Sequence, residues 1–318
     1  MLTVQEVAEF LRAHDNYLIL THKRPDGDTL GCAAGLCRVL RTIGKTAWLL
    51  KNKEVTESYA PYVDALWAPD GYAHDTVVSV DLAALGLFPD NAAAYRDKVD
   101  LAIDHHPSYE GFGKLSCVDP ARAACGEIIY EIAVALDALT AEAAVPLYVA
   151  VSTDTGCFVY GNVTADTHRV AAALMDTGID VRPLNKKHFR TKTKKRLALE
   201  ARLLGGMEFF DDGRIVVVQV PQSLIRELAL TEDDMDDLAS LGGLVEGQDC
   251  SITMKEQKNG GWKISLRTGP RVNATRVCER FGGGGHAAAS GCVIEERDGE
   301  AVKRALVRAV QETAESGK

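Results

Sequence analysis

Long hydrophobic runs are missing from this sequence, which excludes a protein built around membrane-spanning helices. Such a helix needs about 18 or more consecutive apolar residues, whereas the longest candidate, residues 77–87, carries Asp81 in its middle. The first 16 residues also lack the basic start of a secretory signal, and their apolar residues have helical spacing. We therefore expect a helix at the start of the chain and no membrane partner.

Paired cysteines are missing as well. The eight cysteines are scattered along the chain without any C-x-x-C spacing, so the sequence predicts neither a zinc ribbon nor a thiol–disulfide redox motif. Reduced, unpaired thiols are typical of the cytoplasm. We expect a cytoplasmic protein.

An excess of positive charge is the third absence. The chain has 36 lysines and arginines against 45 aspartates and glutamates, a net charge of −9. This balance argues against a protein that coats long nucleic acid through bulk electrostatics. It leaves room for a small phosphorylated substrate held by a few local cations, and for carboxylates that bind metal.

The sequence does contain enough apolar material for two domains. Its 318 residues are 46% hydrophobic, and a domain takes about 150 residues. The first half alternates strand-like and helix-like patterns, which predicts an α/β fold with a parallel sheet covered on both faces. In such sheets, ligands bind at the carboxyl ends of the strands. The predicted strands are 17–21, 47–50, 77–80 and 101–103, and the predicted helices 29–43 and 125–136.

A second, smaller α/β domain with a mixed sheet is predicted for the remainder of the chain. We place the domains at residues 1–185 and 214–318, joined by a helical linker over 186–213, with the active site in the cleft. The basic stretch Lys186–Arg196 fits the solvated face of an interdomain helix better than a track for RNA. Strands are predicted at 214–220, 250–255 and 262–266, and helices at 231–241, 273–281 and 300–312.

Four polar segments carry the candidate chemistry. Three follow predicted strands: HKRPDGD at residues 22–28, Asp81, and Asp104-His105-His106. The fourth contains Asp154 and follows residues 143–151, whose pattern leaves helix and strand open. Carboxylate oxygens mixed with imidazole nitrogens suit manganese, with iron or zinc as alternatives.

Charge balance favours two metal ions. Asp26, Asp28, Asp81 and Asp154 would place four negative charges in one crevice, where like charges repel and raise one another's pKa values. Two divalent cations balance four carboxylates, and two metal ions bound side by side can clamp a phosphoryl group. The alternative for Asp28 is a plain helix cap ahead of residue 29.

The segments HKRPDGD, VVSVDLA, AIDHHPS and VSTDTGCF together resemble the four motifs of the DHH phosphoesterase superfamily. The later GGGGHAAASG resembles the hallmark of the DHH-associated C-terminal domain. The combination is most similar to the NrnA-type oligoribonucleases and 3′-phosphoadenosine 5′-phosphate (pAp) phosphatases. The resemblance implies two Mn²⁺ sites bridged by Asp81, the first with His22 and Asp26, the second with Asp28, His105 and Asp154.

The resemblance also implies roles for residues that are not metal ligands. His106 would contact the substrate phosphate or help protonate the leaving oxygen, and Asp104 would orient its neighbours. The glycine run is a poor helix or strand interior, so we expect a phosphate-binding loop followed by a helical turn at 287–290. The expected substrate-binding residues are Arg267, Asn273, Gly283, Gly284, Gly285 and His286.

Two departures from the family pattern fall on phosphate contacts of the first domain. VDLAALGLFPD, after Asp81, supplies no arginine, and ARAACGEIIYEI has Ala and Cys where serines are frequent in relatives.

From the family resemblance we expect a hydrolase that degrades very short RNA, with pAp as a plausible second substrate. Alternatives are a linear (pApA, pGpG) or cyclic dinucleotide phosphodiesterase, an inorganic pyrophosphatase, and an inert nucleotide sensor. The sequence leaves a homodimer open.

Overall fold

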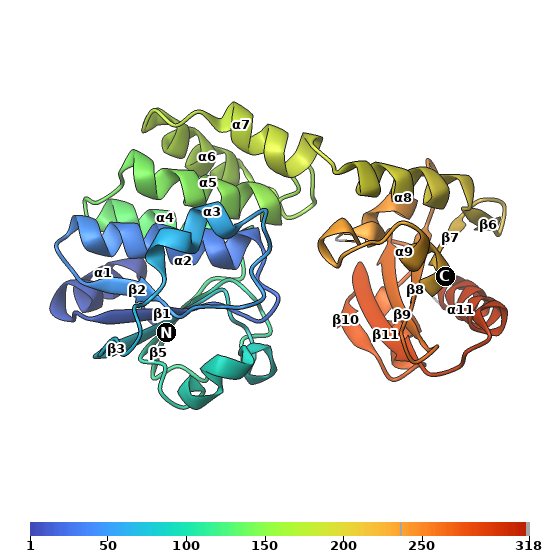
Figure 1. The fold of residues 1–318 in the computed structure, drawn as a ribbon, viewed down its shortest axis with the longest axis horizontal. Helices are drawn as coiled ribbons and strands as arrows, with labels where there is room; N and C mark the ends of the chain where they lie inside the picture. Colours follow the sequence, from blue (N-terminus) through green and yellow to red (C-terminus); the bar gives the residue numbers. More distant parts are fainter. Residues whose placement is uncertain (236, 316–318) are drawn as a thin grey trace. The chain divides into compact units, whose positions relative to one another are not determined.

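The computed structural model describes residues 1–235 and 237–315, and the chain divides into two compact units, Met1–Thr191 and Lys192 onward (Figure 1). The division falls inside the segment for which we predict a linker. Around it the chain forms the short helix α7 (Val181–Asn185), a π-helical turn (Lys186–Arg190) and, after a break, α8 (Lys194–Gly205). Within the described residues, no helix combines the length and apolar character needed to cross a bilayer.

A five-stranded parallel sheet forms the centre of the first unit, as predicted. Its strands lie in the order β2-β1-β3-β4-β5. The fifth strand was not among the predicted ones. The bounds are β1 Tyr17–Leu20, β2 Ala47–Leu49, β3 Thr76–Val80, β4 Leu101–Asp104 and β5 Leu115–Val118.

Alternation along β1 shows that both faces of this sheet are buried. Tyr17 and Ile19 pack into the larger core beneath the long helices, whereas Leu18 and Leu20 pack into a smaller core on the opposite face, beneath short 3₁₀ turns. The helices are α1 Val4–Ala13, α2 Gly27–Thr42, α3 Ala60–Val63, α4 Cys125–Ala135, α5 Ala141–Asp154 and α6 Ala165–Asp176; the 3₁₀ turns are Asp64–Leu66, Leu85–Leu87 and Asp90–Tyr95.

The second unit contains a six-stranded mixed sheet in the order β10-β11-β9-β8-β7-β6, which confirms the predicted sheet type. The strands β7 and β8 pair in parallel, and the other neighbouring strands of the sheet pair antiparallel. The strands are β6 Glu208–Phe210, β7 Ile215–Val220, β8 Cys250–Glu256, β9 Trp262–Thr268, β10 Gly284–His286 and β11 Ala289–Ile294. The remaining helices are α9 Gln222–Glu227, α10 Ala274–Glu279 and α11 Gly299–Glu315.

The two faces of this second sheet are covered to different extents. Core residues of β8 and β9 pack against α10 and α11 on one face. On the other face, α8, α9 and two 3₁₀ segments (Asp233–Met235 and Leu238–Leu244) pack against Val218 and Val220 of β7. The half of that face formed by β9, β11 and β10 carries exposed residues instead.

Two local predictions in the second unit are wrong. The helix expected over 231–241 is replaced by the two 3₁₀ segments, with residue 236 outside the described residues. The glycine run does not form a loop followed by a helical turn: Gly284–His286 is the edge strand β10, and Ala289–Ile294 returns as β11. Pairing along β11 supplies backbone hydrogen bonds that outweigh the poor strand propensity of glycine.

Candidate active site

The loop after β1 supplies two of the predicted carboxylates. Asp26 is the N-cap of α2, and its side chain accepts hydrogen bonds from the backbone amides of Asp28 (3.1 Å) and Thr29 (3.2 Å). The cap of this helix is therefore Asp26 and not Asp28. The buried Asp28 carboxylate instead accepts hydrogen bonds from the amides of Cys125 (2.7 Å) and Gly126 (3.0 Å), at the start of α4.

Gly27 brings this loop close to the fourth segment. A Cβ at Gly27 would lie 2.3 Å from Oγ1 of Thr153, so only glycine permits this approach of α2 to α5. Thr153 precedes Asp154, the last residue of α5. Asp154 thus lies at the end of a helix, whereas the other ligand segments follow strands.

A first group of possible metal ligands consists of His22, Asp26 and Asp81. The Nε2 atom of His22 lies 3.6 Å from Asp26 Oδ1 and 3.8 Å from Asp81 Oδ2. The other ring nitrogen of His22, Nδ1, lies 2.9 Å from the carbonyl of Lys23. A proton on Nδ1 donates to that carbonyl, which leaves the lone pair of Nε2 facing the two carboxylates.

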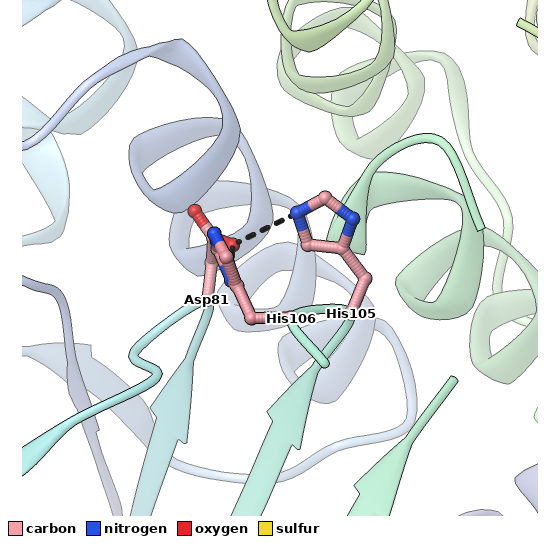
Figure 2. A group of neighbouring side chains, drawn as sticks. All are labelled: Asp81, His105 and His106. Atoms are coloured by element: carbon pink, nitrogen blue, oxygen red, sulfur yellow. Dashed lines mark ion pairs between the residues drawn. The ribbon is translucent and has the colours of Figure 1, made fainter. Parts of the chain in front are cut away.

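A second group consists of Asp28, His105 and Asp154. The Nε2 atom of His105 lies 3.7 Å from Asp28 Oδ2 and 3.5 Å from Asp154 Oδ2. It also lies 3.5 Å from Oδ1 of Asp81. Figure 2 shows the His105 ring facing the Asp81 carboxylate from just beyond the neighbouring strand. Asp81 therefore directs one oxygen to each group.

These separations, 3.5 to 3.8 Å, are too long for good hydrogen bonds. Two ligands each about 2.1 Å from one ion, at tetrahedral or octahedral angles, lie roughly 3.0–3.4 Å apart, so the side chains would close in by a few tenths of an ångström around a bound ion. The Oδ1 atom of Asp81 is buried and has no hydrogen-bond partner among the described residues. A buried carboxylate oxygen that accepts no hydrogen bond is costly unless a cation binds it.

The electrostatics of the group point the same way. Burial and the charge of Asp26 raise the pKa of Asp28 to about 7, and burial and Asp28 raise the pKa of Asp154 to about 7. Burial, with Asp28 and Asp26 nearby, raises the pKa of Asp81 well above its usual range. The pKa of Asp26 is lowered instead, because the hydrogen bond and charge of His22 outweigh the effect of burial. The protein alone thus disfavours the charged form of three of the four carboxylates, and bound cations would reverse this.

Asp104 holds the two histidines that follow it. Its Oδ1 accepts hydrogen bonds from the backbone amides of His105 (2.6 Å) and His106 (2.9 Å), and from Nδ1 of His106 (2.7 Å). Burial lowers the pKa of His106, but the hydrogen bond and the charge of Asp104 together raise this pKa by more than burial lowers it, so the net shift is upward. His106 is thereby favoured in its protonated form, with Nε2 as the proton-bearing atom not bonded to Asp104.

Sequence reasoning missed the backbone groups that hold the ligands. The Nδ1 atom of His105 lies 3.1 Å from the carbonyl of Arg122, and the Arg122 side chain is fixed by Asp119 and Glu131. The amides of Cys125 and Gly126 hold Asp28 in the same way. Backbone donors and acceptors depend on the fold and not on residue type, so no sequence pattern reveals them.

In the second unit, the predicted substrate residues divide between the two faces of β10. Gly284 and Arg267 line a shallow groove of about 560 Å³ on the open half of the sheet. His286 pairs with Ala289, which pairs with Arg267, so all three side chains share that face. Gly283 and Gly285 lie on the opposite side, where a Cβ would meet β11.

Asn273 is a helix-capping residue. It caps α10, and its side chain accepts a hydrogen bond from the amide of Arg276 at 3.2 Å. The next amide, of Ala274, donates to the carbonyl of Ala287 at 2.7 Å, which ties the hairpin turn after His286 to the start of α10. The turn is ordered by these contacts, and Asn273 is not among the residues that line the groove.

Comparisons with known proteins agree with this architecture. Residues 16–151 match the DHH family N-terminal domain and residues 212–316 match the DHHA1 domain. The bifunctional oligoribonuclease and PAP phosphatase NrnA of Thermus thermophilus is 32% identical over 96% of this chain and 93% of that protein. This chain belongs to the DHH phosphoesterase family. It is therefore a hydrolase of phosphoester bonds, and enzymes of this family depend on metal.

Two further proteins are similar to this chain in sequence or in fold. The cyclic-di-AMP phosphodiesterase GdpP of Geobacillus thermodenitrificans is 25% identical over 98% of this chain but only 49% of that protein. An exopolyphosphatase-related protein from Bacteroides fragilis superposes with a TM-score of 0.88 at 22% identity, covering 99% of this chain and 97% of that one. The latter likeness shows the fold alone.

Proposed function

We propose that this DHH phosphoesterase binds two Mn²⁺ ions and degrades very short RNA oligonucleotides to mononucleotides, with pAp as a second substrate. Residues 1–185 would form the catalytic domain, 186–213 the linker and 214–318 the substrate-binding domain. The observation that carries the proposal is the position of Asp81, whose two oxygens face two separate ligand groups. The NrnA-type relatives, matched over nearly the whole chain, support the choice of substrates.

The chain's own residues fix the ligand atoms before any ion binds. His22 and Asp26 with Asp81 would hold one ion, and Asp28, His105 and Asp154 with Asp81 the other. When bound, such a pair of ions activates water and offsets charge on a phosphoryl group. Hydrogen bonds to the carbonyls of Lys23 and Arg122 set the tautomers of His22 and His105, so both rings present Nε2.

His106 is the candidate for proton transfer to the leaving oxygen. Its Nδ1 proton is held by Asp104, which favours the imidazolium. The proton on Nε2 is then available to the oxygen that leaves phosphorus. Asp104 acts only through His106 and is a positioning residue.

Substrate recognition is assigned to the groove of the second unit. The lining residues include the cations Lys263 and Arg267, and no acidic side chain is among them. In a chain with net charge −9, this is a local site that fits phosphate. Exposed His286 lies on the same face as Arg267, two strands away across Ala289.

The test is a panel of substrates incubated with the full chain and Mn²⁺. We expect release of mononucleotides from ribonucleotides of two to five residues, and phosphate release from pAp. Turnover of pyrophosphate alone, or of a cyclic dinucleotide alone, would contradict the proposal. Binding of nucleotides by folded, Mn²⁺-loaded protein without turnover of any substrate would identify a sensor instead.

A further inference from the structure

The groove on the second unit extends well beyond Arg267 and Gly284, the two substrate-binding residues predicted from the sequence that line it. On β9, the side chains of Lys263, Ser265 and Arg267 alternate with buried residues and therefore share the groove face. Arg267 lies at the end of the groove that pairs with Ala289 and His286. Lys263 lies at the other end, directly across from Val293 of β11.

The spacing of the two cations suits a chain of phosphates. Lys263 and Arg267 are four residues apart on one strand, which separates their Cα atoms by about 13 Å. The two phosphates of pAp flank one ribose, as neighbouring phosphates of RNA do, so they lie closer together than the Cα atoms of the two cations. A strand of three or more nucleotides can place one phosphate near each cation.

The floor between the cations is made of small residues. Ser265, Ala289, Gly291 and Gly284 face the groove, so no bulky side chain separates its two ends. Glycine and alanine let a ligand approach the sheet closely. At the far end, Val293 has 49% of its surface exposed beside Lys263. An apolar surface next to a cation matches the two parts of a nucleotide, the face of its base and its phosphate.

We propose that Lys263 and Val293 form a second nucleotide subsite, which binds a neighbouring nucleotide of the RNA while the Arg267 end binds the terminal one. The inference rests on the proposed function and deepens it. It assigns preference for oligonucleotides over a single nucleotide to this sheet face. A mononucleotide such as pAp fills the Arg267 end only.

The experiment compares Lys263→Ala with wild type on pAp and on ribonucleotides of two, three and five residues. The matched control is Lys258→Ala, an exposed lysine in the turn before β9 that does not line the groove. We expect KM for the three- and five-residue substrates to rise about 3- to 10-fold in Lys263→Ala, with KM for pAp unchanged. Val293→Ser should raise KM for the same long substrates by a smaller factor.

The salt dependence of RNA binding distinguishes a phosphate contact by Lys263 from a purely structural role of this residue. Loss of one phosphate contact should make the slope of log binding constant against log salt shallower by about 0.7 for a single-stranded oligonucleotide. Binding is measured with a five-residue phosphorothioate RNA. Equal changes on pAp and on the five-residue RNA, or no change on either, would overturn the subsite while leaving the proposed function intact. Absence of RNA turnover by wild type would overturn both.

Discussion

The carboxylates at the centre of the ligand group in the first unit are buried, although Asp26 at its edge is exposed, whereas the groove of the second unit lies on an exposed sheet face. Asp28 and Asp81 expose 1% and 3% of their surface, and both are surrounded by further carboxylates. Lys263, Arg267 and His286 are exposed, and only small residues separate them. Burying like charges destabilises a protein that lacks bound cations, while exposed cations cost little.

This difference separates two kinds of variant. Changes in the buried group should alter turnover and metal-linked stability together, because the same carboxylates serve both. Changes in the groove should alter substrate affinity with little effect on the chemical step.

The largest effect is expected for Asp81→Asn. Turnover of every substrate should fall about a thousandfold or more, because the shared ligand is lost. The metal-free variant should unfold at a higher temperature than metal-free wild type, because one buried charge among like charges is removed. Thermal denaturation with and without Mn²⁺ measures this. Asp97→Asn, an exposed change in the same unit, is the control. A metal-free variant less stable than wild type would contradict the electrostatic account.

The next effect concerns how closely the glycine run packs against β11. A Cβ at Gly283 would lie 2.2 Å from the carbonyl oxygen of Gly291, whereas a Cβ at Gly284 meets nothing within 4 Å. Gly283→Ala should lower the free energy of unfolding by about 1–3 kcal/mol. Gly284→Ala should lower it by well under 1 kcal/mol. Urea denaturation compares the two, and equal losses would show that the tight contact at Gly283 is unimportant.

His286→Ala addresses substrate affinity directly. We expect KM for pAp and for short RNA to rise about 10-fold, with kcat within about 3-fold of wild type, because a phosphate contact is lost. Steady-state kinetics measure both constants. The control is Arg276→Ala, an exposed cation on α10 outside the groove lining. An unchanged KM in His286→Ala would remove this residue from the binding site.

The smallest effect concerns a histidine that belongs to neither the ligand group nor the groove. His188 stacks on Tyr59 and lies 2.9 Å from the hydroxyl of Tyr62. Burial and the nearby charge of Lys187 lower the pKa of His188 to about 4. The stability this neutral ring contributes is complete above the unfolded pKa of about 6.5 and is lost as pH falls toward 4.

His188→Gln should therefore flatten the pH dependence of unfolding between about pH 6.5 and 4. The expected difference is no more than about 1 kcal/mol, because partial exposure screens the charge. Urea denaturation at pH 7 and pH 5 gives the comparison. A variant with the same pH dependence as wild type would show that His188 does not titrate with this shift.

Sequence reasoning reached further in the first unit than in the second. The polar residues after β1, β3 and β4 could be placed because parallel strands end at one edge of a sheet. Asp154 was a candidate from its position after an apolar segment and from the charge balance, but its helix could not be distinguished from a strand because residues 143–151 are apolar throughout. The close approach at Gly27 could not be predicted, since the neighbour that requires a glycine there, Thr153, is distant in sequence.

In the second unit, local propensity gave the wrong answer. Glycines 282–285 predict a loop, but pairing of Gly284 and His286 with β11 makes them an edge strand. Lys263 gave no sequence signal at all, because a lysine on a strand is most often an ordinary surface residue. Its significance comes from its position across from Val293 and in line with Arg267.

The most direct test of the central claim counts metal ions. Metal-depleted full chain is titrated with Mn²⁺, and bound metal is measured by equilibrium dialysis for wild type, His22→Ala and Asp154→Asn. The account predicts two ions per wild-type chain and one in each variant, because each substitution removes a ligand of one group only. A single ion in wild type, or no ion lost in either variant, would contradict the claim that Asp81 is a ligand of two metal ions.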